Sequence, residues 1–164
     1  MPRPAPATIL PAPEGLVAPG AAEAAFVDVV GLDAVPAGTM TRISRGDLDV
    51  LVAHTAAGLV AVDDRCPHMA APLSIGLLEG CLLACPLHQG RFDLSTGATE
   101  RFPTTGGLDA EGGYHPPWIA LGSPARPEPT DLKARARALT RIRRLRYYPL
   151  RVREGRIEVA LPGS

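Results

Sequence analysis

The sequence predicts an all-β fold, a barrel or sandwich of short strands. Gly and Pro number 17 and 18 of the 164 residues, about 21% together, whereas the average share is about 12%. Such a composition favours turns and short strands over long helices. Short apolar or alternating segments also recur at regular spacing between turn residues, which is typical of antiparallel β-proteins. The length suits one domain with a modest core.

The expected strands begin at Phe26 and share β-branched, aromatic or alternating residues bounded by turn signals. They cover residues 26–30, 39–44, 48–54, 59–62, 81–84, 91–94, 147–153 and 156–161. The turn at Glu154-Gly155 joins the last two into a hairpin.

Two segments depart from this strand pattern. Residues 2–25 contain six prolines and many alanines, which predicts a flexible, partly polyproline arm over residues 1–25 and a domain over residues 26–164. Residues 103–129 hold six Pro and five Gly, a loop composition. With the segment that follows, they form an expected insertion at about 104–146, within which Trp118 and Tyr114 could anchor the loop to the β-domain.

A basic helix is expected over Thr130 to Arg146. Thr130 is a suitable N-cap, and Asp131 suits the positive end of the helix dipole. Apolar residues recur at helical spacing at Leu132, Ala136, Leu139 and Ile142. Seven basic residues lie between Lys133 and Arg146.

The formal net charge of zero conceals a division, because residues 1–125 carry a net charge of −7 and residues 126–164 a net charge of +7. The basic helix could brace the domain through its apolar stripe or dock an acidic redox protein. Nucleic-acid binding is not expected, since Tyr147 and Tyr148 are the only nearby aromatic residues for stacking.

The composition also limits the location of the chain. No apolar stretch approaches 18 residues and the N-terminal residues do not resemble an export signal, so we expect neither a membrane span nor export. Three cysteines do not suggest a disulfide framework. We therefore expect a reducing cytoplasm, where paired Cys and His residues are first considered as metal ligands.

Two short motifs carry the chemistry. Cys66-Pro67-His68 and Cys85-Pro86-Leu87-His88 are separated by sixteen residues. Two thiolates and two imidazoles could hold one zinc ion or a [2Fe–2S] cluster. Because each loop supplies one Cys and one His, the pattern suits a dinuclear site. We expect the other Cys and His residues, Cys81, His54 and His115, to be structural.

The region around these motifs resembles the Rieske [2Fe–2S] ferredoxin family, and more closely its soluble branch. The resemblance covers roughly 90 residues and is carried by Cys66-Pro67-His68, Pro72-Leu73, Gly76, Gly80, Cys85-Pro86-Leu87-His88, Phe92-Asp93, Thr96-Gly97, Tyr148-Pro149-Leu150-Arg151-Val152 and Gly155-Arg156-Ile157-Glu158-Val159. It implies three antiparallel sheets with the cluster-binding loops at one tip. Cys66 and Cys85 would bind the inner iron, and His68 and His88 an outer iron exposed to a redox partner.

The sequence departs from the family pattern in three places. The loops lack the extra cysteines that form a bracing disulfide in some members, Gln89 stands where Gly is frequent, and the insertion precedes the closing hairpin. Met69 and Leu87 could either fill their loops or form an apolar docking rim.

The resemblance implies a one-electron carrier between a flavin reductase and an oxygenase or similar terminal oxidoreductase. An alternative is a small subunit of a larger reductase, similar to the small subunit of nitrite reductase. A structural zinc protein is a further alternative. We do not expect an oxygenase catalytic chain, because the two remaining histidines, His54 and His115, lie far apart in the sequence without helical spacing, and the sequence is too short for an additional mononuclear iron domain. An enzyme acting by itself is less expected than a component of an oxidoreductase system.

Overall fold

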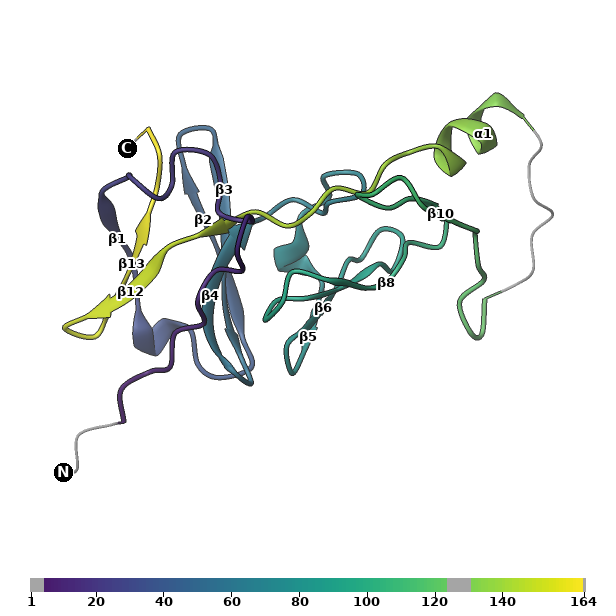
Figure 1. The fold of residues 1–164 in the computed structure, drawn as a ribbon. Helices are drawn as coiled ribbons and strands as arrows, with labels where there is room; N and C mark the ends of the chain where they lie inside the picture. The colour runs from purple at the N-terminus through teal and green to yellow at the C-terminus, as the bar shows by residue number, and fades with distance from the viewer. Residues whose placement is uncertain (1–4, 124–130, 164) are drawn as a thin grey trace.

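A computed structural model describes residues 5–123 and 131–163 of the chain. The all-β prediction is confirmed: apart from two single-turn 3-10 helices (Leu32–Ala34 and Leu73–Ile75) and one short α-helix, the regular elements are strands (Figure 1). The strands are β1 (Phe26–Gly31), β2 (Met40–Arg45), β3 (Leu48–Thr55), β4 (Gly58–Asp63), β5 (Leu77–Glu79), β6 (Leu82–Ala84), β7 (Arg91–Asp93), β8 (Thr99–Arg101), β9 (Gly107–Leu108), β10 (Tyr114–His115), β11 (Tyr147–Tyr148), β12 (Leu150–Arg153) and β13 (Arg156–Ala160).

These strands form three antiparallel sheets and a two-stranded ribbon. The sheets have the strand orders β1-β13-β12, β11-β4-β3-β2 and β5-β6-β7-β8, and β9 pairs with β10 in the ribbon. Strands β5, β8, β9 and β10 were not predicted. They have two or three residues each, too few for an alternating pattern to be recognised.

The sheet β11-β4-β3-β2 is the middle layer, because both of its faces are buried. In a strand successive side chains point to opposite faces, and β3 places Val50 and Val52 in one core and Leu51 and Ala53 in the other. The first core lies against the sheet β1-β13-β12. The second core includes Leu83 and Phe92 of the sheet β5-β6-β7-β8 and also contains Cys66 and Cys85.

The N-terminal segment corrects one prediction, because residues 5–25 do not form a flexible arm. Leu10 N–H donates to Leu59 O at 2.9 Å, and Ala18 N–H donates to Tyr147 O at 2.8 Å. Ala18 and Ala21 are buried in the core between the first two sheets. The segment therefore packs along the β-domain, and residues 1–4 of the predicted arm lie outside the described part of the chain.

The closing hairpin differs from its prediction at its first strand. Tyr147 and Tyr148 form β11 and pair with β4, whereas β12 begins at Leu150 and pairs with β13. Pro149 stands between the two strands and has no N–H for a ladder. The chain crosses from one sheet to the other at this proline, and the two tyrosines enter opposite cores.

The basic helix is much shorter than predicted. Helix α1 covers Leu132–Ala138 and is capped by Asp131, whose carboxylate accepts the Ala134 N–H; the proposed cap Thr130 lies outside the described residues. Leu132 and Leu139 are 78% and 64% exposed, so the predicted apolar stripe is not buried there. Residues 141–146, which we call the strap, are not helical and run back toward the sheets.

The strap explains why the predicted helix over Thr130 to Arg146 is too long. Ile142 and Leu145 are buried in the core, whereas the four arginines of the strap are exposed. Ile142 N–H donates to Leu108 O at 2.7 Å, and Leu108 N–H donates to Thr140 O at 3.0 Å. The apolar residues are therefore buried by an extended segment paired with β9, a tertiary contact that local spacing does not encode.

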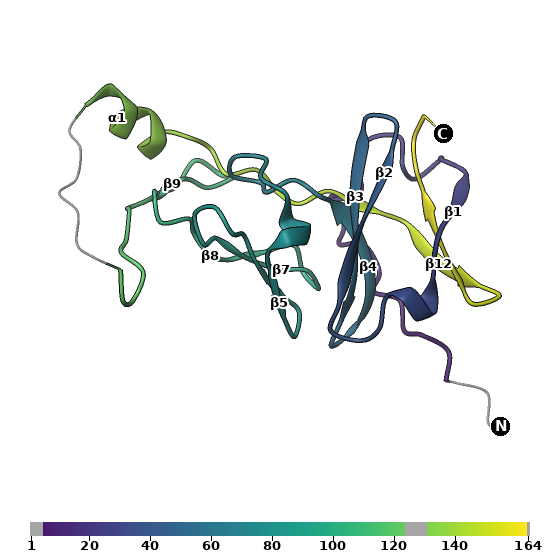
Figure 2. The ribbon, with the colours of Figure 1, turned by 180° about the vertical axis from the view of Figure 1, so that it is seen from behind.

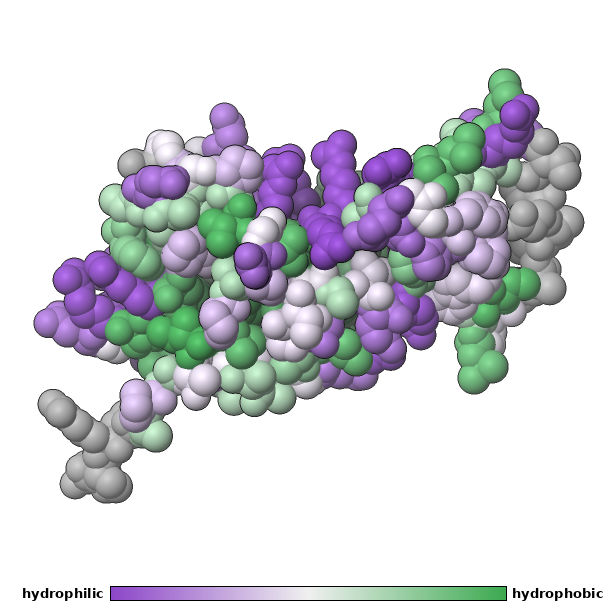
Figure 3. Space-filling model, viewed as in Figure 1, coloured by the Kyte–Doolittle hydropathy of each residue, from purple (hydrophilic) through white to green (hydrophobic). Residues whose placement is uncertain are grey.

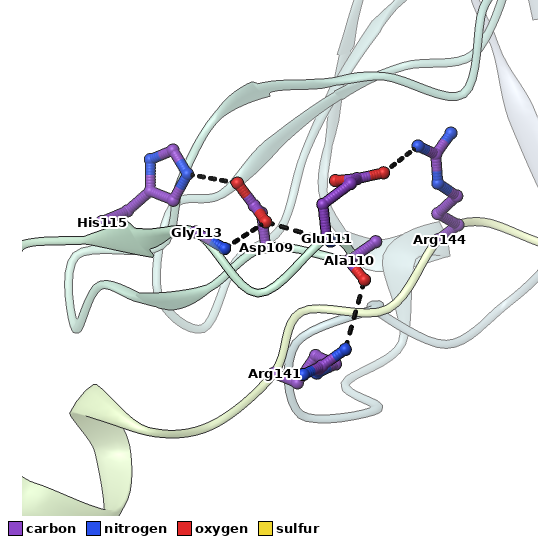
Figure 4. Close-up of polar contacts among 7 residues, drawn as sticks. All are labelled: Asp109, Ala110, Glu111, Gly113, His115, Arg141 and Arg144. Atoms are coloured by element: carbon purple, nitrogen blue, oxygen red, sulfur yellow. Dashed lines mark hydrogen bonds and ion pairs between the residues drawn. The ribbon is translucent and has the colours of Figure 1, made fainter.

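The insertion is held together by a polar network around the turn between β9 and β10 (Figure 4). The Asp109 carboxylate accepts from the N–H groups of Glu111 and Gly113 and contacts His115 Nε2 at 3.0 Å. The Arg144 guanidinium pairs with the Glu111 carboxylate, and Arg141 donates to Ala110 O at 3.2 Å. These contacts fasten the ribbon to the strap.

The molecule is elongated. The β12–β13 hairpin lies near one end and α1 at the other, with the sheet β5-β6-β7-β8 between them (Figures 1 and 2). No helix within residues 5–123 and 131–163 is long and apolar enough to cross a membrane.

Candidate metal centre

The two motif loops share one backbone conformation. In the first, Cys66 N–H donates to Ala71 O at 2.7 Å and Cys66 O accepts from Ala70 N–H at 2.9 Å. The second loop has the same two hydrogen bonds: Cys85 N–H donates to Gly90 O at 2.8 Å, and Gln89 N–H donates to Cys85 O at 3.2 Å. The loops follow β4 and β6, so two neighbouring sheets present them side by side.

The fourth residue after each cysteine has a left-handed backbone. Ala70 has a φ of 59° and Gln89 a φ of 58°, in the region that favours glycine. This conformation explains why glycine is frequent at the position of Gln89 in similar loops. In this protein Gln89 adopts the same left-handed conformation although it is not glycine.

The four motif side chains come together as two like pairs. Cys66 and Cys85 are both buried, and the Cys66 thiol donates a hydrogen bond to the Cys85 sulfur. The rings of His68 and His88 lie edge to face, with their centroids 4.9 Å apart. Among the described residues, no group of three or more His, Cys, Asp or Glu side chains is arranged to hold a single metal ion.

The electrostatics favour the ligand form of three of the four side chains, whereas the hydrogen bond to Cys85, together with burial, raises the pKa of the Cys66 thiol. The hydrogen bond from Cys66 lowers the pKa of Cys85 to about 6, against the opposing effect of burial. Burial, with the nearby charge of His88, lowers the pKa of His68 to about 4, and burial with the charge of Arg137 also lowers the pKa of His88. Thiolate and neutral imidazole are the forms that bind metals.

The residues fit a metal cluster by one further observation. His88 Nδ1 is buried and has no hydrogen-bond partner in the described part of the chain. A buried polar nitrogen without a partner is costly, and a metal ion would supply one. His88 also lines a small cavity between the two loops, together with Cys66, Cys85 and His68.

A buried carboxylate positions the first loop. Asp64 is 2% exposed and accepts from both the N–H and the hydroxyl of Ser74, at 2.7 and 2.5 Å. Arg42 neutralises it at 3.2 Å. These bonds join the strand before Cys66 to the turn after the loop, so both ends of the loop are fixed.

The insertion covers part of the site, which sequence reasoning missed. Thr105 Oγ1 lies 3.3 Å from His68 Nε2, Thr104 N–H donates to His88 O at 2.8 Å, and Arg143 N–H donates to Pro67 O at 3.1 Å. As a result His68 is only 8% exposed. His68 is therefore largely covered, whereas His88 is half-buried.

A second set of contacts holds the insertion against the second loop. Trp118 Nε1 donates to Phe102 O at 2.8 Å, and the Arg101 guanidinium lies 4.9 Å from the Trp118 ring centroid. Arg101 also donates to Gln89 O at 3.3 Å. Trp118 thus anchors the insertion as expected, whereas Tyr114 is 56% exposed.

The remaining Cys and His residues lie outside the two pairs. His54 Nδ1 contacts Val35 O at 2.8 Å, and His115 stacks on Phe102 with ring centroids 3.5 Å apart. Cys81 is half-buried in the turn before β6. Met69 and Leu87, beside the ligand motifs, are 54% and 53% exposed and form an apolar rim.

Several known proteins are similar to this chain in sequence or in fold. The chain is 36% identical over 80 residues to the ferredoxin component of the naphthalene 1,2-dioxygenase/salicylate 5-hydroxylase systems of Ralstonia sp., covering 49% of this chain and 77% of the relative. It is 39% identical, with the same coverage, to the ferredoxin component of the 2,4-dinitrotoluene dioxygenase system of Burkholderia sp. (strain RASC). The solved structure of Sphingomonas yanoikuyae B1 ferredoxin matches 84% of this chain and 100% of its own, with a TM-score of 0.56 at 19% identity.

The family assignment rests on a match over more than half of the chain. The Rieske [2Fe-2S] domain model matches residues 25–111, which include both motif loops and the strands β4 and β6 that precede them. The protein belongs to the Rieske [2Fe-2S] domain family, and its cofactor is a [2Fe–2S] cluster.

Proposed function

We propose that Cys66 and Cys85 hold one iron of the [2Fe–2S] cluster and that His68 and His88 hold the other. The observation that carries this assignment is the separation of the donors into a buried thiol pair and a less buried imidazole pair. When bound, the cluster supplies reversible one-electron chemistry. His88 Nδ1, which has no partner among the described residues, is the donor atom on the second loop.

The protein functions as a one-electron carrier for an oxygenase system, receiving electrons from a flavin reductase. The two relatives described above are ferredoxin components of dioxygenase systems, which supports this role. The half-buried His88 and the apolar rim of Met69 and Leu87 give a partner access to the cluster end. We also propose that the protein acts in the cytoplasm, and that residues 5–25 join the domain predicted over residues 26–164, which is interrupted by an insertion at about 104–146.

A reductive titration with a matched pair of cysteine variants tests the carrier and its ligands. The holoprotein, prepared without oxygen, should take up one electron per two irons and return it to a mild oxidant. Cys85→Ser should lose the cluster absorption, because serine removes one thiolate ligand. Cys81→Ser should keep both the absorption and the one-electron uptake.

Two results would contradict the proposal. Loss of the cluster in Cys81→Ser with retention in Cys85→Ser would reassign the ligands. A colourless protein that contains zinc and takes up no electron would exclude the carrier role.

A further inference from the structure

An open groove runs beside the first motif loop. It has a volume of about 680 Å³ and is lined by the loop around Cys66 and His68, by the strap, and by the start of β3. Its basic side chains are Arg65, Arg141, Arg143, Arg144 and Arg146, and its acidic side chains are Asp47, Asp49 and Asp63. Figure 3 shows hydrophilic residues gathered along this edge, between the sheets and α1.

The groove carries more positive than negative side chains, five arginines against three aspartates. Asp49 is paired with Arg42 at 2.7 Å, and Arg144 is paired with Glu111. Arg143 and Arg146 form no ion pair within residues 5–123 and 131–163, and both are exposed. The groove therefore presents exposed guanidinium groups that have no carboxylate partner among the described residues.

The backbone that carries these two arginines is fixed relative to the loop around Cys66 and His68. The backbone of Arg143 is bonded to Pro67, and the carbonyl of Arg146 accepts from Asp63 N–H at 2.9 Å. Between them Leu145 is buried. The strap therefore cannot swing away from the loop that carries Cys66 and His68 without breaking these bonds and exposing Leu145.

We propose that this groove binds an acidic segment of the protein that exchanges electrons with the cluster. The inference rests on the proposed carrier function and adds the chemistry of the partner. Fixed positive charge beside the loop would attract carboxylates and raise the rate of encounter. The occupant is an acidic protein and not a nucleic acid, because Tyr148 is the only Phe, Tyr or Trp among the described residues that line the groove and it is buried, which leaves no exposed ring there for base stacking.

Electron transfer to two haem proteins of opposite charge tests the proposal. The reduced holoprotein is mixed with acidic cytochrome b5 or basic cytochrome c in a stopped-flow instrument, and the reduction of each haem by one electron is followed. The strap variant is Arg143→Gln with Arg146→Gln. The control variant is Arg153→Gln with Arg156→Gln, which changes the net charge equally on the β12–β13 hairpin, away from the groove.

At low ionic strength the strap variant should reduce cytochrome b5 roughly tenfold more slowly, within the range of electrostatic steering, and the control should stay within about twofold of the original protein. Salt should remove most of the difference, because the Debye length falls from about 10 Å at 0.1 M to about 3 Å at 1 M. Reduction of cytochrome c should not slow in the strap variant.

Equal effects of the two variants would overturn the proposal, because net charge and not the groove would then set the rate. An unchanged rate in the strap variant would also overturn it, and so would tighter binding of a DNA duplex than of cytochrome b5. The absorption spectrum and midpoint potential are measured on every variant. A protein with an intact cluster but no charge dependence refutes the groove alone, whereas a protein without a cluster refutes the carrier function.

Discussion

Ala70 and Gln89 are equivalent residues in the two motif loops, and both have a left-handed backbone, with φ values of 59° and 58°. Each donates its N–H to the carbonyl of the cysteine four residues earlier. The two halves of the metal centre are therefore built by the same turn, although the histidine stands two residues after Cys66 and three after Cys85.

This equivalence predicts that glycine is tolerated or favoured at both positions. Ala70→Gly and Gln89→Gly should each raise stability by up to about 1 kcal/mol, because a left-handed conformation costs about 1–2 kcal/mol for other residues. The melting temperature of the holoprotein should rise by about 2–4 °C. The control is Ala57→Gly, at an exposed turn residue without a positive φ, which should lower the melting temperature. A lower melting temperature in all three variants would contradict the strain argument.

The midpoint potential should lie at the low end of the Rieske range, at roughly −150 mV. Hydroxyl donors to the cluster sulfurs stabilise the more negative reduced state, but two hydroxyls of this region donate to other acceptors. Tyr147 donates to Leu94 O and Ser74 to Asp64. A potential above about +100 mV by voltammetry would require donors that these bonds do not leave free.

Thr105 should tune the potential through His68. If His68 binds iron through Nδ1 as proposed, its Nε2–H would donate to the Thr105 hydroxyl 3.3 Å away, which would make the imidazole a stronger electron donor. Thr105→Val should therefore raise the midpoint potential. Thr104→Val is the matched control, because Thr104 contacts the site through its backbone; equal shifts in both variants would show that the hydroxyl is not responsible.

Gly76 should be intolerant of any side chain. A Cβ at this position would lie 2.1 Å from the carbonyl oxygen of Ala84, the residue that precedes Cys85. The backbone itself is no obstacle, because a φ of −80° suits any residue. Gly76→Ala should cost about 1–3 kcal/mol of stability, the range for overpacking. The matched variant is Gly80→Ala, because a Cβ at position 80 would meet open space but the backbone φ is +63°. Thermal unfolding of the two variants therefore separates steric clash from backbone strain. A smaller loss of stability in Gly76→Ala than in Gly80→Ala would contradict the predicted clash.

Much of the β-domain could be predicted because its signals are local. The alternation in β3 and β4 and the Cys-Pro-His motif are read directly from neighbouring residues. These signals predicted the central sheet, the placement of the two loops side by side and the family.

The rest depends on tertiary contacts. Ala18 and Ala21 resemble a disordered Pro/Ala arm in sequence, and only the cleft between two sheets gives them a place in the core. The spacing of Leu139 and Ile142 is compatible with a helix, but pairing of the strap with β9 buries Ile142 and leaves Leu139 exposed. Thr105 and His68, which are in contact in the structure, are 37 residues apart in the sequence. No sequence motif indicates this contact.

Iron and acid-labile sulfide analysis of the protein and its His88→Cys variant tests the ligand assignment most directly. Both should contain about two irons and two sulfides per chain, because cysteine can replace histidine as an iron ligand. The variant should have a lower midpoint potential, since a thiolate adds negative charge at the iron. His54→Cys, outside the site, should leave the potential unchanged. One zinc per chain without sulfide, or an unchanged potential in His88→Cys, would contradict the account.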